Sequence, residues 1–273
     1  MLPILRGYGA LIADEILATG AKVNVWDLGN EVERGVGGIA VPPIAQPPGW
    51  TYKAPDAVDP EIGKLDLVRY VRMSEADRVA WLSRHLWPYI GQAFAAVAEG
   101  IRSVDKQARF STHTSGMVAY SPSVFAGFFR SLDAAGFKAE EAGLSYYPSA
   151  DGKPANRFTA FKDMVAAATA RLNRPVFIAE YGYPVGPFKF GKDNWANEVP
   201  NFPVSVQGQA KYLREVVAWG ARTGHLSGIR PWAPDLPVPG WGEMSLFALE
   251  GRKATARPSI DSIREGLAAA GKP

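Results

Sequence analysis

Apolar residues follow two different spacings along this chain, and each spacing predicts a kind of element. Apolar positions that recur every three or four residues predict helices, and short continuous apolar runs predict buried strands. We expect helices at 4–19, 74–104 (as one helix or a pair), 121–135, 158–172, 206–220 and 258–269, and strands at 23–28, 109–114, 142–147, 175–179 and 226–232. Strands that alternate with helices predict an α/β fold built on a parallel sheet.

One long segment follows neither spacing. Residues 35–73 are rich in glycine and proline, and include Pro42-Pro43 and Pro47-Pro48. Irregular segments of this length inside a domain are usually functional or disordered. We therefore expect a single domain over residues 1–273 with a long loop insertion at about 35–75.

Composition narrows the class of protein. With 273 residues, 47% hydrophobic and 21% charged, the chain is typical of a soluble globular protein with a sizeable core. A net charge of only +3, with scattered basic residues, argues against a nucleic-acid partner. The absence of cysteine excludes disulfides and thiolate metal sites and leaves the compartment undecided. No apolar run reaches the roughly 18 residues of a membrane span, and residues 1–20 do not have the pattern of a signal peptide.

Two apolar runs end in a glutamate. Asp27-Leu28-Gly29-Asn30-Glu31 ends the first predicted strand, and Phe177-Ile178-Ala179-Glu180 ends the fourth. Parallel-sheet enzymes place their active sites at the carboxyl ends of strands. Two carboxyl groups, one protonated and one ionised, are what glycoside hydrolysis requires. The pair therefore predicts a glycosidase, although a glutamate in a solvated loop is the alternative for Glu31.

Further motifs occur in a fixed order along the chain. Gly143-Leu144-Ser145-Tyr146-Tyr147-Pro148 precedes Ala179-Glu180-Tyr181-Gly182-Tyr183-Pro184, and Gly208-Gln209-Ala210 follows. Together with Asn30-Glu31, this set resembles glycoside hydrolase family 53, the endo-β-1,4-galactanases, within the clan of retaining (β/α)8 glycosidases. The resemblance covers nearly the whole chain, except roughly residues 35–75.

The resemblance implies a TIM-barrel fold and assigns the five predicted strands to the fourth through eighth of the barrel. The first three βα units have no counterpart, so we expect an N-terminally shortened member, with exposed sheet edges that invite self-association. The chain also departs from the family at Arg230-Pro231-Trp232-Ala233-Pro234, where the family usually has Trp-Glu-Pro. This departure and the long segment after Glu31 bear on galactan specificity.

The resemblance also implies roles for individual residues. Glu31 is the expected general acid/base and Glu180 the expected nucleophile; Asn30 would bind the sugar 2-hydroxyl, or otherwise form a turn after the strand. One of Tyr146 and Tyr147 would donate to Glu180, because successive strand residues face opposite sides, and the resemblance slightly favours Tyr146. His113 would hydrogen-bond the acid/base or a sugar hydroxyl, and Trp232 would lie under the sugar ring. Structural or core roles are the alternatives for His113 and Trp232.

The remaining candidates lie in loops. Trp50, Trp195 and Trp241 are candidates for extending the cleft, and Asp235 and Glu243 for binding a sugar hydroxyl or a cation, although solvated loop carboxylates are the simpler interpretation. We expect no cofactor and no catalytic metal, because histidine and carboxylate ligands are not clustered.

The working hypothesis is a retaining endo-hydrolase of β-1,4-galactan or a related β-linked polysaccharide. The alternatives are an inactive barrel that binds carbohydrate without cleaving it, and a hydrolase of the same clan acting on mannan, glucan or xylan. Export is typical of the family, so a secreted or periplasmic protein is suspected from the resemblance alone.

Overall fold

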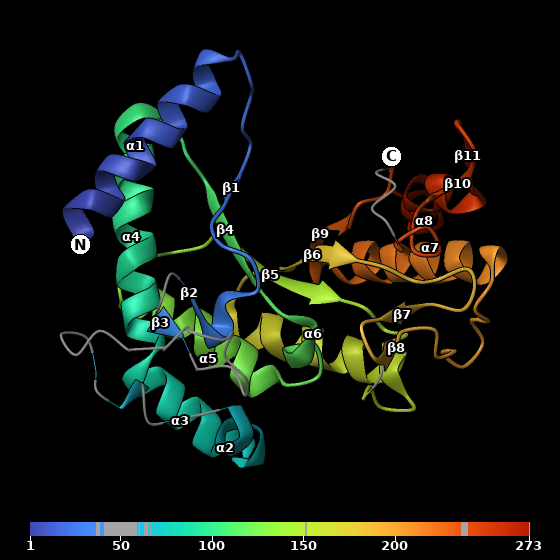
Figure 1. Cartoon of the computed structure of the whole chain (residues 1–273), viewed down its shortest axis with the longest axis horizontal. Coiled ribbons are helices and arrows are strands. Elements are labelled where there is room, and N and C mark those ends of the chain that lie inside the picture. The colour runs from blue at the N-terminus through green and yellow to red at the C-terminus, as the bar shows by residue number, and fades with distance from the viewer. Residues whose placement is uncertain are drawn as a thin grey trace. The chain divides into compact units, whose positions relative to one another are not determined.

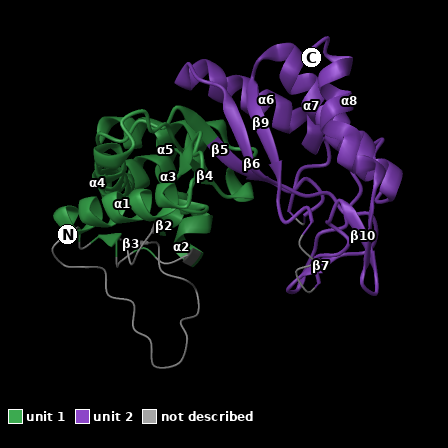
Figure 2. Ribbon diagram, turned by 90° about the horizontal axis from the view of Figure 1, so that it is seen from above, with its two compact units in different colours: residues 1–142 green, residues 143–273 purple. Residues whose placement is uncertain are grey.

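The computed structural model describes residues 1–36, 39–40, 59, 61–62, 65, 67–150, 152–235 and 240–272. These residues form two compact units, Met1–Ala142 and Gly143–Pro273 (Figure 2). The boundary falls within strand β5, so this strand begins in unit 1 and ends in unit 2. Among the described residues, no helix combines the length and the apolar character that crossing a membrane requires.

Unit 1 contains two strand–helix repeats that follow an N-terminal helix. Its elements are α1 (Leu2–Ala18), β1 (Trp26–Asp27), η1 (Val32–Arg34), β2 (Gly35–Val36), β3 (Ile39–Ala40), α2 (Leu67–Arg72), α3 (Glu75–His85), α4 (Trp87–Val104), β4 (Phe110–Thr114), η3 (Gly116–Val118), α5 (Pro122–Ala134) and the start of β5 (Glu141–Tyr146). β1 pairs in parallel with β4, and Trp26 lies opposite Phe110. The order in this unit is β1-β4-β5.

The packing of α1 along α4 depends on two glycines (Figure 1). A Cβ atom at Gly9 would lie 2.2 Å from the Val97 carbonyl oxygen, and one at Gly100 would lie 2.0 Å from the Arg6 carbonyl oxygen. Real side chains do not approach so closely, so only glycine lets the two helix backbones meet here.

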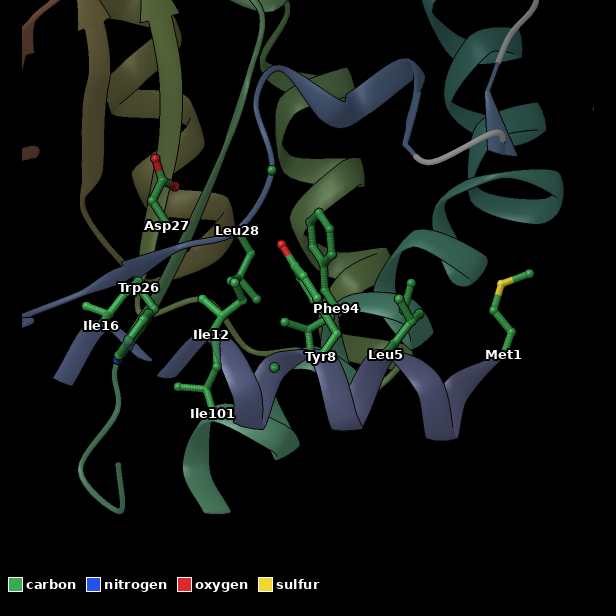
Figure 3. A pocket seen from close by; sticks show the side chains of 14 residues that line it. Met1, Leu5, Tyr8, Ile12, Ile16, Trp26, Asp27, Leu28, Phe94 and Ile101 are labelled. Carbon is green, nitrogen blue, oxygen red and sulfur yellow. The ribbon is translucent and has the colours of Figure 1, made fainter. Parts of the chain in front are cut away.

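An apolar groove of about 520 Å³ lies beside this helix pair (Figure 3). Leu5, Ile12, Phe94 and Ile101 are among the side chains that line it. Binding sites for polar ligands combine an apolar wall with a few convergent polar groups, and this groove is lined almost entirely by apolar residues. It is therefore a poor candidate for a sugar site.

Unit 2 continues the alternation of strands and helices. Its elements are the rest of β5, α6 (Arg157–Leu172), β6 (Val176–Tyr181), β7 (Lys189–Phe190), β8 (Asp193–Asn194), α7 (Val206–Thr223), β9 (Leu226–Pro231), β10 (Phe247–Glu250), β11 (Lys253–Ala256), η4 (Pro258–Asp261) and α8 (Ser262–Ala269). The order here is β5-β6-β9, and β6 pairs in parallel with β9. The two antiparallel hairpins, β7–β8 and β10–β11, are additions to this alternation.

The five predicted strands and six predicted helical regions are all found, with local differences. The helical region at 74–104 is two helices, which separate at Leu86, because Pro88 in the first turn of α4 has no N–H to continue the hydrogen bonds of α3. The first strand is only two residues long, Trp26–Asp27. The hairpins were not predicted, and α2 lies within the segment that was expected to be irregular, because elements of two to six residues are too short to give a measurable spacing. Most of the predicted loop insertion at about 35–75 lies outside the described residues, as does Trp50.

Candidate active site

In unit 1, a tight turn follows β1 and carries the first candidate carboxylate. Gly29 and Glu31 both have left-handed backbone, with φ of 81° and 50°. Glycine adopts this conformation freely, whereas a glutamate there is strained by about 1–2 kcal/mol. Asn30 is exposed and Glu31 is half-buried, so both side chains have access to solvent at the end of the strand.

His113, in β4, lies buried behind this turn. Its Nε2 is 3.2 Å from Asn30 Oδ1, and its Nδ1 is 3.2 Å from Asp27 Oδ2. Ser111 Oγ donates to the other oxygen of Asp27 at 2.9 Å. Asp27 can point toward β4 because it lies on the side of β1 away from α1, whereas Leu28 points toward that helix (Figure 3). Only 2% of the His113 surface is exposed, and its ring lies against Asn30 and Asp27.

Glu33 is a buried carboxylate that the sequence analysis did not single out. It lies in η1, two residues after Glu31, and is completely inaccessible to solvent. Ser115 donates to it twice, from its backbone N–H at 2.9 Å and from its Oγ at 2.6 Å. Burial raises the pKa of the Glu33 carboxyl, while the two hydrogen bonds from Ser115 oppose that rise. The only sequence signal was a second glutamate in Asn30-Glu31-Val32-Glu33, which reads as an ordinary loop residue.

In unit 2, Glu180 lies near the end of β6 and retains 8% exposure. The Tyr147 hydroxyl donates to Glu180 Oε2 at 2.8 Å. A hydrogen bond of this kind favours the ionised carboxylate, which is the form that a nucleophile requires. A Cβ atom at Gly182 would lie 3.0 Å from the Tyr147 ring, so a larger residue there would displace the ring.

The expectation that favoured Tyr146 as the donor to Glu180 is wrong. Tyr146 is the last residue of β5 and faces the other side, where its hydroxyl lies 2.5 Å from that of Tyr212. Its ring stacks on Phe161 of α6, with centroids 3.7 Å apart. The alternation of side chains therefore places one of the two tyrosines at Glu180, as predicted, but it is Tyr147.

This assignment predicts different results for the two tyrosines. Tyr147→Phe removes a hydrogen bond to a charged group, which is worth about 1.5–3 kcal/mol, so we expect kcat to fall by roughly 10- to 100-fold. Tyr146→Phe is the matched control, because its hydroxyl contacts Tyr212 and not Glu180. Steady-state kinetics of both purified variants provide the measurement. Equal losses in the two variants would contradict the role of Tyr147.

Aromatic side chains surround Tyr147. Trp232 directly follows β9, and its ring centroid is 4.6 Å from that of Trp241. The ring of Trp195 lies 5.0 Å from that of Tyr147. The structure therefore brings Trp195, Trp232 and Trp241 together beside the residue that bonds Glu180. Such rings offer flat apolar faces of the kind on which the C–H face of a sugar can stack.

The Gly208-Gln209 pair of the third motif is structural. A Cβ atom at Gly208 would lie 1.7 Å from the Pro203 carbonyl oxygen, so no other residue fits there. Gln209 is fully buried; it donates to the Tyr183 carbonyl at 2.8 Å and accepts from Ser259 Oγ at 2.6 Å. These contacts tie the start of α7 to the segment that follows Glu180.

The two candidate loop carboxylates are Asp235 and Glu243. Asp235 is exposed, and Glu243 is half-buried with Oε2 next to Gly186. Within the part of the chain that the structure describes, no group of three or more His, Asp or Glu side chains is arranged to hold a metal ion.

Comparison with known proteins identifies the family. The model described as Glycosyl hydrolase family 53 matches residues 73–252, which is more than half of the chain. The chain belongs to glycosyl hydrolase family 53. The family-53 match includes Glu180, Tyr147 and the aromatic residues around them, and it confirms the resemblance drawn from the motifs.

Two solved structures share the fold of this family-53 chain. One comes from a study of two fungal β-1,4-galactanases, with a TM-score of 0.63 and 15% identity over 95% of this chain and 67% of the other. The second is the catalytic domain of a family-53 protein of Ignisphaera aggregans, with a TM-score of 0.62 and 16% identity over 97% of this chain and 65% of the other. The five parallel strands are therefore those of a partial (β/α)8 barrel.

A curated relative is also longer than this chain. The uncharacterized protein in the bgaB 5' region of Niallia circulans is 25% identical over 186 residues, which make up 61% of this chain and 48% of the relative. The matched region thus spans about half the length of that relative.

Proposed function

We propose that this family-53 chain is a retaining endo-glycoside hydrolase of β-1,4-galactan or a closely related β-linked polysaccharide. The observation that carries the proposal is the Tyr147–Glu180 hydrogen bond beside three tryptophans, at the end of a parallel strand. An ionised carboxylate next to apolar ring faces is suited to a sugar carbon that becomes positively charged in the transition state. The galactan preference rests on the family and on the fungal β-1,4-galactanases that share the fold.

The proposed mechanism has two displacements. Glu180 attacks the anomeric carbon as the bond from that carbon to the leaving oxygen breaks, and Glu31 gives its proton to that oxygen. Glu31 then removes a proton from water, which attacks the anomeric carbon and releases Glu180 as a carboxylate. Two inversions retain the configuration, and the mechanism requires the two carboxyl groups to lie about 5–5.5 Å apart.

Three further side chains have supporting roles in this proposal. Asn30, oriented by His113, hydrogen-bonds the sugar 2-hydroxyl, and that contact strengthens in the transition state. Tyr147 donates a hydrogen bond to the Glu180 carboxylate, and Trp232 provides the surface under the sugar ring.

Release of reducing ends from a panel of polysaccharides tests the proposal. We expect the 273-residue protein to cleave β-1,4-galactan in preference to mannan, glucan and xylan, and proton NMR to show the β-anomer of the product first. Initial formation of the α-anomer would contradict retention. Binding of galactan in affinity electrophoresis without cleavage would favour the alternative of a carbohydrate-binding barrel.

We further propose that the protein self-associates through its exposed sheet edges, of which the edge at β1 also has apolar surface beside it. The apolar groove and the exposed Leu11 and Ile4 of α1, which are 56% and 75% accessible, support this. We expect light scattering to give a dimer mass at micromolar concentration, and Leu11→Glu to shift it toward the monomer. Leu11→Lys, which places the opposite charge at the same exposed position, should also shift the mass toward the monomer, whereas a shift seen only in Leu11→Glu would reflect added acidic charge. A monomer at all concentrations would exclude self-association.

A further inference from the structure

Asn30 and Glu33 lie on either side of Glu31, and each is hydrogen-bonded to a residue at the end of β4. On one side, Asn30 contacts His113. On the other side, Glu33 accepts two hydrogen bonds from Ser115. Val32, between Glu31 and Glu33, is 3% exposed and packs close to Gly29. The strained left-handed backbone at Glu31 persists only if the residues around it hold it.

The anchor at Glu33 is stronger than a usual surface contact. Ser115 donates to both oxygens of the Glu33 carboxyl group, from its backbone N–H and from its hydroxyl, and the Arg34 guanidinium lies nearby, with Nε 3.5 Å from Oε1. The backbone carbonyl of Glu33 also accepts from Trp87 Nε1 at 2.8 Å. A buried carboxylate with matched donors resists displacement, since losing them leaves an uncompensated buried charge. Because Ser115 directly follows β4, the anchor rests on a regular element.

We propose that Glu33 is a positioning residue, which through Ser115 holds the left-handed turn at Glu31 and so aims the carboxyl group of the acid/base at the leaving oxygen. This inference rests on the proposed function of Glu31. Glu33 itself is inaccessible to solvent, so a substrate cannot reach it. Its effect therefore acts through the position of Glu31, and it is expected to be largest in the step in which Glu31 gives up its proton.

A comparison of two substrates isolates that step. In β-1,4-galactan the leaving group is a sugar hydroxyl, which is poor and must be protonated. In a 2,4-dinitrophenyl β-galactobioside the leaving group is dinitrophenolate, which departs without acid assistance. Glu33→Met has a similar shape but cannot accept hydrogen bonds from Ser115. For this variant we expect the ratio of kcat/KM on galactan to kcat/KM on the aryl glycoside to fall by about 10- to 100-fold. Glu33→Gln retains an oxygen acceptor for the Ser115 N–H and should recover much of that ratio.

Glu140→Met provides the matched control. Glu140 is also a carboxylate that accepts from the backbone of β4, at Phe110 N and 2.6 Å, but it does so at the opposite end of the strand. A loss of stability alone would lower kcat/KM on both substrates by the same factor. We therefore expect Glu140→Met to leave the ratio of the two kcat/KM values unchanged. Equal ratios for wild type, Glu33→Met and Glu140→Met would overturn the proposal.

Hydrogen exchange of the same variants separates the two possible failures. If Glu33 holds the turn, peptides covering residues 28–34 exchange faster in Glu33→Met than in wild type, whereas Glu140→Met leaves them unchanged. Unchanged exchange in Glu33→Met would overturn the proposal whatever the activity. If wild type cleaves neither substrate and Glu33→Met still exchanges faster, the proposed function is rejected together with the catalytic part of the inference. The structural role of Glu33 in holding the turn is then retained.

Discussion

Glu180→Gln is expected to reduce hydrolysis of β-1,4-galactan by about 10⁴-fold or more, the scale on which loss of a catalytic nucleophile acts. Glutamine has nearly the same shape and can still accept from Tyr147, so the fold and the aromatic surroundings should persist. It cannot, however, form the glycosyl ester on which double displacement depends. Initial rates of reducing-end release measure the effect.

Two further measurements make this prediction specific. Glu250→Gln changes an exposed carboxylate of β10 and should retain wild-type rates. A 2-deoxy-2-fluoro galactoside with a good leaving group should add one sugar mass to the wild-type peptide that contains Glu180, and none to the same peptide of Glu180→Gln. A variant that keeps a tenth of the wild-type rate, or a label on another carboxylate, would show that Glu180 is not the nucleophile.

Glu31→Gln is expected to have the second largest effect, with a different signature. General acid catalysis typically contributes 10²- to 10⁴-fold, so the rate on galactan should fall by about that factor. Aryl glycosides with a 2,4-dinitrophenyl leaving group should react with far smaller loss in the first step, because their departure needs no proton.

Added azide gives the decisive observation for Glu31. A small anion needs no general base, so it should accelerate turnover of the aryl glycoside by Glu31→Gln and yield the β-glycosyl azide. Glu15→Gln, an exposed carboxylate of α1, serves as the control. Absence of any azide product, together with equal losses on both substrates, would remove Glu31 from the role of acid/base.

The main elements of the fold could be predicted from the chain, because their signals are local. The α7 helix begins at Ser205, whose hydroxyl accepts from the Gly208 N–H at 3.0 Å, and it ends at the left-handed Gly224. Such caps and the apolar spacing between them depend on nearby residues alone. The two-residue β1 was harder, since its extent depends on hydrogen bonds to β4, more than 80 residues later.

The candidate site was predictable only in part. Chain order and strand ends identified Glu31, Asn30 and Glu180, because a strand delivers its last side chains to the same edge as its parallel neighbours. The choice between adjacent tyrosines depended on which side of β5 faces α6, and that is a property of packing. Glu33 was missed because its partner, Ser115, lies 82 residues away in sequence.

The sequence by itself determined the alternation of strands and helices, the family and the presence of two strand-end glutamates, since each follows from residues that are close together or motifs in a fixed order. Only the tertiary structure decided that Tyr147 serves Glu180, that His113 lies behind Asn30, and that a buried Glu33 is bonded to Ser115. The physical reason is that hydrogen bonds and burial depend on distances in space, and segments remote along the chain acquire those distances only when the core packs.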